Sequence, residues 1–180
     1  ICASGSTSPS PLGAACEIGG YCSQAYVRIS CPSGSYGVTE GATSSNRGCT
    51  SCEPGYSCPS IGMVKSGRVM CPAGHYCPMG TVNPYSCPSG TYSALTMQAS
   101  IGTCTTCDSG KFCSNSGTTS ESTCPTHYYC PTGTSDYSGT PCPAGKYSEA
   151  SGLMSASQCI TCPIGHYCPG NTSPQVCPAG

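Results

Sequence analysis

The chain has 180 residues and a formal net charge of −1, and it contains 20 cysteines, 24 glycines and 17 prolines but no tryptophan and one phenylalanine. Six basic and seven acidic residues provide no basic surface, so we expect no nucleic-acid partner. The large apolar residues are too few for a hydrophobic core of the usual size, whereas this cysteine content is typical of secreted disulfide scaffolds. We therefore predict an extracellular protein, secreted or at the cell surface.

Taken in chain order, the sequence divides into repeats. We interpret 1–15 as the end of a preceding repeat, because six cysteines then recur three times at an interval of about 55 residues, over 16–70, 71–123 and 124–176. The letters "CPAG" at 177–180 begin the pattern again, so we expect this chain to be part of a longer array. No apolar run reaches the roughly 18 to 20 residues of a membrane helix, so we expect no membrane contact within this segment.

Each repeat contains three copies of one phrase: cysteine, often proline, any residue, glycine, any residue and an aromatic residue, as in "CPAGHYC" at 71–77. Glycine occupies the fourth place in nine of the ten copies, and His127 is the exception. Such regularity predicts a turn with positive φ, or a backbone that passes close to a disulfide. We expect the aromatic rings to cover the disulfides and form a small core in each repeat. These rings are Tyr21, Tyr36, Tyr56, Tyr76, Tyr92, Phe112, Tyr129, Tyr147 and Tyr167.

Regular secondary structure is expected to be sparse, because glycine, proline, serine and threonine interrupt every segment and no helical periodicity is present. Short β-hairpins are plausible at 90–96 ("GTYSALT") and 145–151 ("GKYSEAS"), and we expect no helix beyond a single turn. The predicted fold is small and disulfide-rich: an elongated head-to-tail repeat rod with short β-hairpins and little regular secondary structure.

Three kinds of chemistry could use so many cysteines. Pairs such as Cys49 and Cys52 have the spacing of zinc ligands, but the other cysteines come as C-x5-C and there are only three histidines to complete a site. Thioredoxin-like redox chemistry would need a βαβ context, which is absent. We therefore predict disulfides, with no metal site and no cofactor.

The pattern C-P-x-G-x-Y-S, a loop rich in serine and glycine, and then C-x2-C-x-x-G resembles the ephrin-receptor-like and TNF-receptor-like cysteine-rich repeats over essentially the whole chain. Repeats of this kind also resemble stretches of protist and algal surface proteins, including those of flagellar hairs. In such families the first module is a loop closed by its two flanking cysteines. The resemblance therefore implies the disulfides Cys31–Cys49, Cys87–Cys104 and Cys142–Cys159.

The TNF-receptor-like second module pairs its cysteines in alternation. Carried over, this implies Cys52–Cys71, Cys58–Cys77, Cys107–Cys124 and Cys113–Cys130. The present chain has C-x5-C where that family commonly has C-x2-C, so nested pairs such as Cys58–Cys71 with Cys52–Cys77 stay open.

Groups that could carry catalysis are scattered. His75 and His166 stand at a place of the phrase that holds lysine, serine or threonine in other copies, which is typical of an exposed turn. The seven acidic residues offer no paired carboxylates and no oxygen cage for calcium. We expect no catalytic residues and no enzymatic activity. Asn171 begins the N-glycosylation sequon Asn-Thr-Ser, and the stretch "STSPSP" at 6–11 could carry O-linked sugars.

We expect a structural protein: an extracellular, glycosylated and disulfide-bonded rod that serves as a shaft, stalk or filament subunit. Its partners would be other copies of itself or neighbouring repeats, together with covalent glycans. The alternative is the ligand-binding ectodomain of a cell-surface receptor. An exposed apolar cluster would favour the receptor, and "IGMVKSGRVM" at 61–70 is the stretch to inspect; its other interpretation is a covered loop between repeats.

Overall fold

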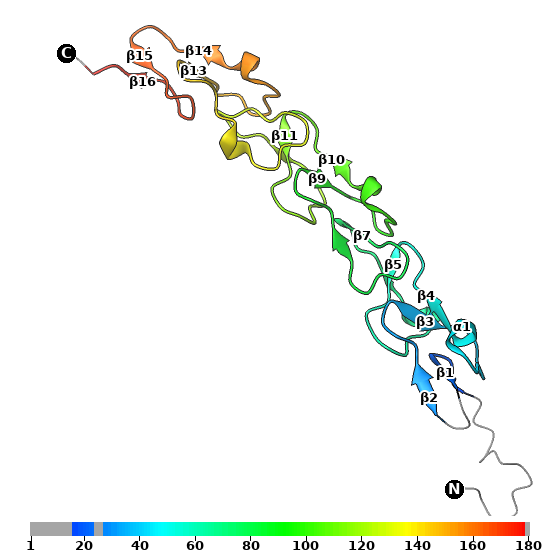
Figure 1. Cartoon of the computed structure of the whole chain (residues 1–180). Helices are drawn as coiled ribbons and strands as arrows, with labels where there is room; N and C mark the ends of the chain where they lie inside the picture. Colours follow the sequence, from blue (N-terminus) through cyan, green and yellow to red (C-terminus); the bar gives the residue numbers. More distant parts are fainter. Residues whose placement is uncertain (1–15, 24–26, 179–180) are drawn as a thin grey trace, which may run out of the picture. The chain divides into compact units, whose positions relative to one another are not determined.

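The computed structural model describes residues 16–23 and 27–178 (Figure 1). The expectations for 1–15, including Cys2 and the "STSPSP" stretch, lie outside the described residues, as do the last two residues of 177–180. The described residues form two compact units. The first comprises residues up to Pro72 with Tyr76–Tyr85 and Met97–Ser100, and the second comprises Ala73–His75, Ser86–Thr96 and the residues from Ile101 onward.

Short paired strands make up nearly all of the regular secondary structure. The two-stranded sheets are β1 (Gly20–Cys22) with β2 (Arg28–Ser30), β3 (Ser35–Gly37) with β4 (Cys49–Ser51), β5 (Tyr56–Ser57) with β6 (Val69–Met70), β7 (His75–Tyr76) with β8 (Tyr85–Ser86), β9 (Thr91–Tyr92) with β10 (Thr105–Thr106), β11 (Lys111–Phe112) with β12 (Ser122–Thr123), β13 (Lys146–Tyr147) with β14 (Ile160–Thr161), and β15 (His166–Tyr167) with β16 (Gln175–Val176). The helical turns are α1 (Ser45–Gly48), η1 (Lys65–Gly67), η2 (Ile101–Thr103), η3 (Tyr137–Gly139) and η4 (Ala156–Gln158).

The fold is therefore small and disulfide-rich, with short antiparallel hairpins and little helix, as the composition predicts. Strands form in both stretches where hairpins were expected, 90–96 and 145–151, but each strand pairs with a segment farther along the chain. Strand β9 pairs with β10, and β13 pairs with β14, in each case across a long loop. The reason is covalent: β10 directly follows Cys104, which is bonded to Cys87 just ahead of β9.

Nine disulfides connect 18 of the described cysteines, and Cys177 is exposed and unpaired within the described residues. The three long-loop bonds implied by the family resemblance are present: Cys31–Cys49, Cys87–Cys104 and Cys142–Cys159. The others are Cys16–Cys22, Cys52–Cys58, Cys71–Cys77, Cys107–Cys113, Cys124–Cys130 and Cys162–Cys168. Such a framework forms in oxidising compartments, so it indicates an extracellular or secreted protein.

The alternating second-module pairs are wrong, and so are the nested ones. Cys52–Cys71, Cys58–Cys77, Cys107–Cys124 and Cys113–Cys130 do not form, because each C-x5-C segment closes on itself. The turn between the two cysteines brings their Cα atoms to 6.0 Å in Cys71–Cys77, well within the span of a disulfide. A partner only six residues away is available before any distant one.

Backbone hydrogen bonds recur at a shorter interval than the sequence repeat. We define a module as the segment from the first cysteine of one phrase to the residue before the next such cysteine. Each 55-residue repeat holds three modules, and all nine disulfides lie within single modules. The described modules begin at Cys16, Cys31, Cys52, Cys71, Cys87, Cys107, Cys124, Cys142 and Cys162.

Four backbone hydrogen bonds connect one module to the next. In the first of them, the amide of the next module's first cysteine donates to the carbonyl of the fourth residue of the phrase. In the first compact unit the Cys52 amide donates to the Gly34 carbonyl at 2.8 Å, and in the second the Cys107 amide donates to the Gly90 carbonyl at 3.0 Å. Three further bonds accompany each. They are Gly34 N to Cys58 O, Gly37 N to Met63 O and Gly62 N to Cys31 O in the first unit, and Gly90 N to Cys113 O, Ser93 N to Thr118 O and Gly117 N to Cys87 O in the second. The same four backbone bonds thus join the modules that begin at Cys31 and Cys52 in the first unit and those that begin at Cys87 and Cys107 in the second.

The fourth place of the phrase has positive φ at every described copy, as predicted. Glycine takes values such as +77° at Gly74 and +78° at Gly145, and His127 adopts +68° although it is not glycine. At Gly74 the space is also restricted, because a Cβ would lie 2.1 Å from the Gly117 carbonyl oxygen. At Gly145 no atom lies within 4 Å of that position. The conformation is common to all copies, but the close approach is not.

The cystines themselves form the core. Every described side chain that is less than 2% exposed is a cysteine, except Ser57. Aromatic rings cover disulfides at two places: Tyr36 and Tyr56 pack around Cys52–Cys58, and Tyr129 packs with Leu153 around Cys142–Cys159. The other phrase rings are half-buried or exposed, with Tyr167 at 47%. The aromatic core expected in each repeat is therefore found in the first and third repeats, and the described residues of the second repeat contribute no such cluster.

Gly74 and Gly145 share the left-handed conformation but only Gly74 is crowded, so substitutions at the two positions measure the two effects separately. We expect Gly145→Ala to destabilise its surroundings by about 1 kcal/mol, the cost of a left-handed conformation with a Cβ. Gly74→Ala adds the clash with Gly117 and should cost about 1–3 kcal/mol more. Amide hydrogen exchange at Cys87, which donates to Gly74, and at Cys162, which donates to Gly145, measures both effects. Equal losses in the two variants would show that the close approach is unimportant.

Candidate functional site

Within the described ranges, no group of three or more histidine, cysteine, aspartate or glutamate side chains could hold a metal ion. The Nδ1 atoms of His75 and His166 face the carbonyl oxygens of Ala73 and Ile164, at 3.1 and 3.2 Å, within their own turns. Both histidines are half-buried strand residues in β7 and β15, whereas the sequence suggested exposed turns. No helix in the described part of the chain is long and apolar enough to cross a membrane.

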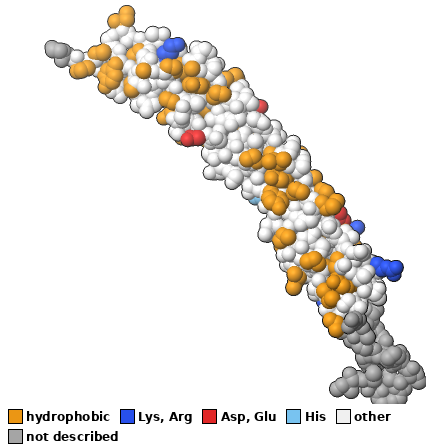
Figure 2. Space-filling model, in the orientation of Figure 1, with side chains coloured by type: hydrophobic (Ala, Val, Ile, Leu, Met, Phe, Trp, Pro, Cys, Tyr) orange, Lys and Arg blue, Asp and Glu red, His pale blue; other side chains and the backbone are white. Residues whose placement is uncertain are grey.

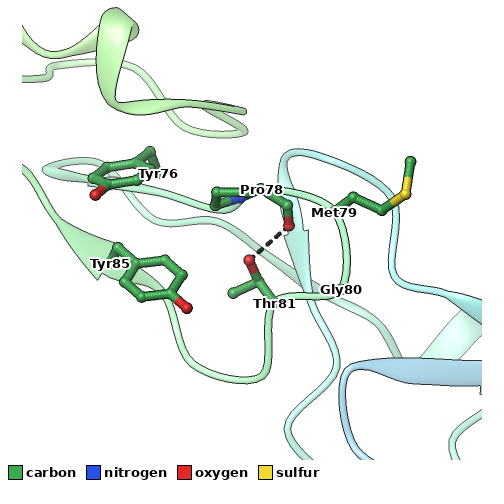
Figure 3. Close-up of a pocket in the computed structure, with 6 residues that line it drawn as sticks. All are labelled: Tyr76, Pro78, Met79, Gly80, Thr81 and Tyr85. Carbon is green, nitrogen blue, oxygen red and sulfur yellow. Dashed lines mark hydrogen bonds between the residues drawn. The ribbon is translucent and has the colours of Figure 1, made fainter.

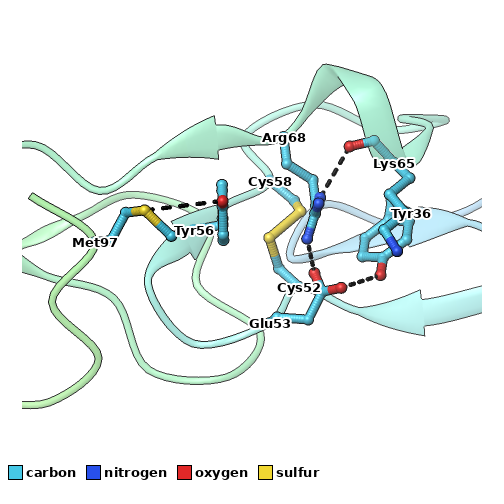
Figure 4. Close-up of polar contacts among 8 residues, drawn as sticks. All are labelled: Tyr36, Cys52, Glu53, Tyr56, Cys58, Lys65, Arg68 and Met97. Carbon is cyan, nitrogen blue, oxygen red and sulfur yellow. Dashed lines mark hydrogen bonds and ion pairs between the residues drawn. A yellow bond between two sulfur atoms is a disulfide. The ribbon is translucent and has the colours of Figure 1, made fainter.

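The most connected polar cluster surrounds Glu53 (Figure 4). The Tyr36 hydroxyl donates to Glu53 Oε1, and the Arg68 guanidinium donates to Glu53 Oε2 and forms an ion pair with it. Arg68 Nε also donates to the Lys65 carbonyl oxygen at 2.9 Å. The two carboxylate oxygens are thus occupied by separate donors from separate segments of the first compact unit.

The guanidinium of Arg68 lies between two aromatic rings. Its carbon is 4.5 Å from the Tyr56 ring centroid and 5.2 Å from that of Tyr36, which is the geometry of cation–π attraction. The Arg68 side chain is only 16% exposed, so these contacts are shielded from solvent. The Tyr56 hydroxyl in turn points to Met97 Sδ at 3.9 Å. Side chains from the modules that begin at Cys31, Cys52 and Cys87 therefore meet here.

The cluster changes the protonation equilibria of its members. Burial alone would raise the pKa of Glu53, but the hydrogen bonds from Tyr36 and Arg68 and the charge of Arg68 outweigh it, and the pKa is lowered. Burial, and then the Glu53 carboxylate, raise the pKa of Tyr36. At neutral pH the cluster therefore holds an ionised glutamate and a neutral tyrosine. Its chemical role is to lock modules together.

A second, smaller cluster lies in the second compact unit. The Glu121 side chain is 8% exposed; its carboxylate accepts from the Asp108 amide at 2.6 Å and pairs with Lys111 Nζ at 2.7 Å. The Asp108 amide first, and Lys111 second, lower the pKa of Glu121. This contact joins the β11–β12 hairpin to the turn before it.

A shallow hollow of about 210 Å³ opens beside the β7–β8 hairpin (Figure 3). The rings of Tyr76 and Tyr85 stack across the two strands, with centroids 5.6 Å apart and an interplanar angle of 23°. Thr81 is 3% exposed, and its hydroxyl donates to the Pro78 carbonyl at 2.6 Å. Met79 and Gly80 complete the lining, and the Met79 side chain extends away from the tyrosines.

The stretch 61–70 is neither fully covered nor one apolar patch. Met63 packs against the cluster around Cys52–Cys58, and Arg68 turns inward to Glu53, whereas Ile61 is 72% exposed. Val64 lines a larger hollow of about 560 Å³ together with Ile18, Tyr36, Gly37, Val38, Lys65 and Ser66. Figure 2 shows hydrophobic side chains distributed among polar ones on the visible face, with few charges.

Asn171 is exposed on a bend between the Cys162–Cys168 disulfide and β16. Gly170, just before it, has φ of +107°. An exposed side chain on a bend is accessible to modifying enzymes, which is what an N-glycosylation sequon requires.

Sequence reasoning missed the Glu53 cluster and the Tyr76–Tyr85 hollow. Glu53 and Arg68 are 15 residues apart in irregular segments, so no periodicity relates them. Tyr85 lies outside the phrase, and only the pairing of β7 with β8 brings it to Tyr76. A charged residue directly after a phrase cysteine, as at Glu53, was the one available signal.

Comparisons with known proteins give local similarity. No family model matches the chain. Over 36 residues, 20% of the chain, it is 50% identical to an ABC-type transporter, claG, of Penicillium crustosum, and it spans 4% of that protein. Over 112 residues, 62% of the chain, it is 30% identical to ABC transporter G family member 25 of Oryza sativa subsp. japonica, and it spans 10% of that protein. The chain thus spans a tenth or less of the length of these curated relatives.

The Glu53 cluster predicts an acid-dependent loss of stability. Because the pKa of Glu53 is lowered below 4.5 in the folded state, its stabilising effect is complete above that pH and is lost as the pH falls through the folded value. We expect the free energy of unfolding of the native protein to fall more steeply below about pH 4.5 than that of Glu53→Gln, by less than about 1 kcal/mol because Glu53 is partly exposed. Denaturant unfolding at a series of pH values measures this.

The matched control is Glu149→Gln, which changes an exposed carboxylate after β13. This variant should retain the pH profile of the native protein. If Glu53→Gln retains it as well, the cluster does not contribute to stability through the ionisation of Glu53.

Proposed function

We propose that this chain is an extracellular structural protein, in which disulfide-bonded modules form a rod that serves as a shaft, stalk or filament subunit. The observation that carries the proposal is the set of four backbone hydrogen bonds between successive modules, which recurs in both compact units. Arrays of this kind, in which each repeat contacts its neighbours, grow by addition of repeats. The main contribution of a chain with this bonding is its length.

Disulfides act within modules and backbone hydrogen bonds act between them, and this difference supports the proposal. Each disulfide closes a loop inside one module, so it stabilises that module without depending on the next. The connections between modules use backbone groups, which every sequence possesses. Module side chains can therefore vary without loss of the connection, provided that the turn at the fourth place is kept.

The second candidate is an extracellular part of a larger cell-surface protein that binds a ligand. The partial similarity to the rice ABC transporter, of which this chain spans 10%, is the observation that favours it. Exposed apolar residues such as Ile61 and the hollow beside Val64 would then serve as contact surfaces. The resemblance to ephrin-receptor-like and TNF-receptor-like repeats is compatible with either candidate.

Solution scattering of the oxidised chain tests the rod. A compact protein of this length has a radius of gyration of about 16 Å. We expect a value well above this figure, because the bonds and contacts between modules connect those that are adjacent or next but one in the sequence, and such local connections do not draw distant modules together. A radius of gyration near 16 Å would overturn the proposal. Electron microscopy of native, unreduced material then separates the candidates, since uniform fibres favour a filament subunit and dispersed short rods favour a stalk or ectodomain.

We also propose that Asn171 carries an N-linked glycan. We expect the intact mass of the chain, secreted from eukaryotic cells, to fall after treatment with peptide N-glycosidase, because the sequon lies exposed on a bend. Asn171→Gln should abolish the change, and Asn115→Gln, which alters an asparagine outside any sequon, should leave it intact. An unchanged mass in the native sequence removes the idea.

A further inference from the structure

The hollow at the β7–β8 hairpin has the composition of a sugar-binding site. It is lined by Tyr76, Pro78, Met79, Gly80, Thr81 and Tyr85, and none of these side chains is charged. Its polar atoms are hydroxyl and backbone groups, and its apolar surface consists mainly of aromatic and proline rings. A neutral lining of this kind offers no partner for an anionic or cationic ligand, because burial of an unpaired charge is costly.

The tyrosine hydroxyls are free to bind a ligand. Other tyrosines use this group inside the protein: Tyr36 donates to Glu53, and Tyr167 donates to Gln175. The hydroxyls of Tyr76 and Tyr85 form no hydrogen bond within the described ranges, and Tyr85 is 55% exposed. A ring with one accessible face and a free hydroxyl presents both apolar and polar contacts to a ligand.

The surroundings hold this platform in place. Stacking on Tyr76 fixes the orientation of the Tyr85 ring across the strand pair. Thr81 is buried, and its hydroxyl donates to the Pro78 carbonyl, so this hydrogen bond fixes the lining between the two residues (Figure 3). The disulfide Cys71–Cys77 anchors the segment next to Tyr76. A preorganised site of this kind loses little entropy on binding.

The size of the hollow selects one ring. Its volume of about 210 Å³ is below the range of about 300–1,000 Å³ for sites that take drug-sized ligands, so it suits a ligand of one ring and not several. A single six-membered sugar ring is of this order. It has an apolar face of C–H groups that can stack on Tyr85, and hydroxyls at its edge that can reach the tyrosine hydroxyls.

We propose that the Tyr76–Tyr85 hollow binds one residue of a neutral oligosaccharide or polysaccharide, with Tyr85 as the stacking platform. The larger hollow beside Val64 does not suit this ligand, because Ile18, Val38 and Val64 give it an aliphatic lining. The assignment is independent of the rod. It requires the folded module, and it gives the protein a means of attachment to an extracellular carbohydrate matrix.

The test is an NMR titration of the oxidised, isotope-labelled chain with cellotetraose, mannotetraose and chitotetraose, each to about 10 mM, where even a millimolar affinity is near saturation. We expect at least one of the three to shift the amide signals of residues 76–85 and to leave those of the β15–β16 hairpin unchanged. Tyr85→Ala should weaken that binding about fivefold, which corresponds to the loss of an aromatic contact of about 1 kcal/mol. Tyr85→Phe keeps the ring and should retain most of the affinity.

Tyr167→Ala is the matched control, because Tyr167 is also an exposed strand tyrosine, at 47%, but lies outside the hollow. It should bind as the native chain does. Unchanged signal dispersion in each variant shows that the modules remain folded. The proposal is overturned if none of the three sugars shifts residues 76–85, if Tyr85→Ala binds as well as the native chain, or if a decaproline peptide shifts these residues while the sugars do not.

Discussion

The left-handed turn at the fourth place of the cysteine phrase is the constraint on which the rest of this structure depends. It reverses the chain between two cysteines six residues apart, as at Cys71 and Cys77, and so makes the short disulfide possible. It also directs the Gly74 carbonyl to the next module's amide at Cys87. In the chain-entropy model, a loop of this length contributes about 2 kcal/mol and the longer loops about 3 kcal/mol each. Cystines thereby take the place of a hydrophobic core.

This arrangement separates stability from surface chemistry. Because the buried positions are cystines and the connections between modules are backbone bonds, most other side chains are free to differ from module to module. The roles of these side chains differ from one module to another. In one place Arg68, Glu53 and two tyrosines lock neighbouring modules, and in another Tyr76 and Tyr85 leave a neutral hollow open to solvent. The same hairpin geometry thus supports a structural contact and a candidate binding site.

The sequence predicted the class of fold from composition, and the positive φ of the fourth place from the regularity of its glycines. Both follow from local physics: few apolar residues cannot form a core, and glycine has the least difficulty in the left-handed region. The pairing of the cysteines was only partly predictable. The long loops followed the resemblance, but the alternating pairs failed because they were carried over from a family with C-x2-C spacing, whereas each C-x5-C segment of this chain closes on itself, as at Cys71–Cys77.

By itself, therefore, the sequence determined that cystines hold the chain and that the backbone turns left-handed once in each phrase, and its cysteine content indicated an extracellular setting. The sequence also showed three phrases in each 55-residue repeat, but only the tertiary structure decided that each phrase begins a separate module, because the backbone hydrogen bonds that join the modules cannot be read from residue types. The tertiary structure also decided which side chains meet. Glu53 with Arg68, and Tyr76 with Tyr85, come together through loop closure and strand pairing, and such long-range contacts depend on the whole path of the chain.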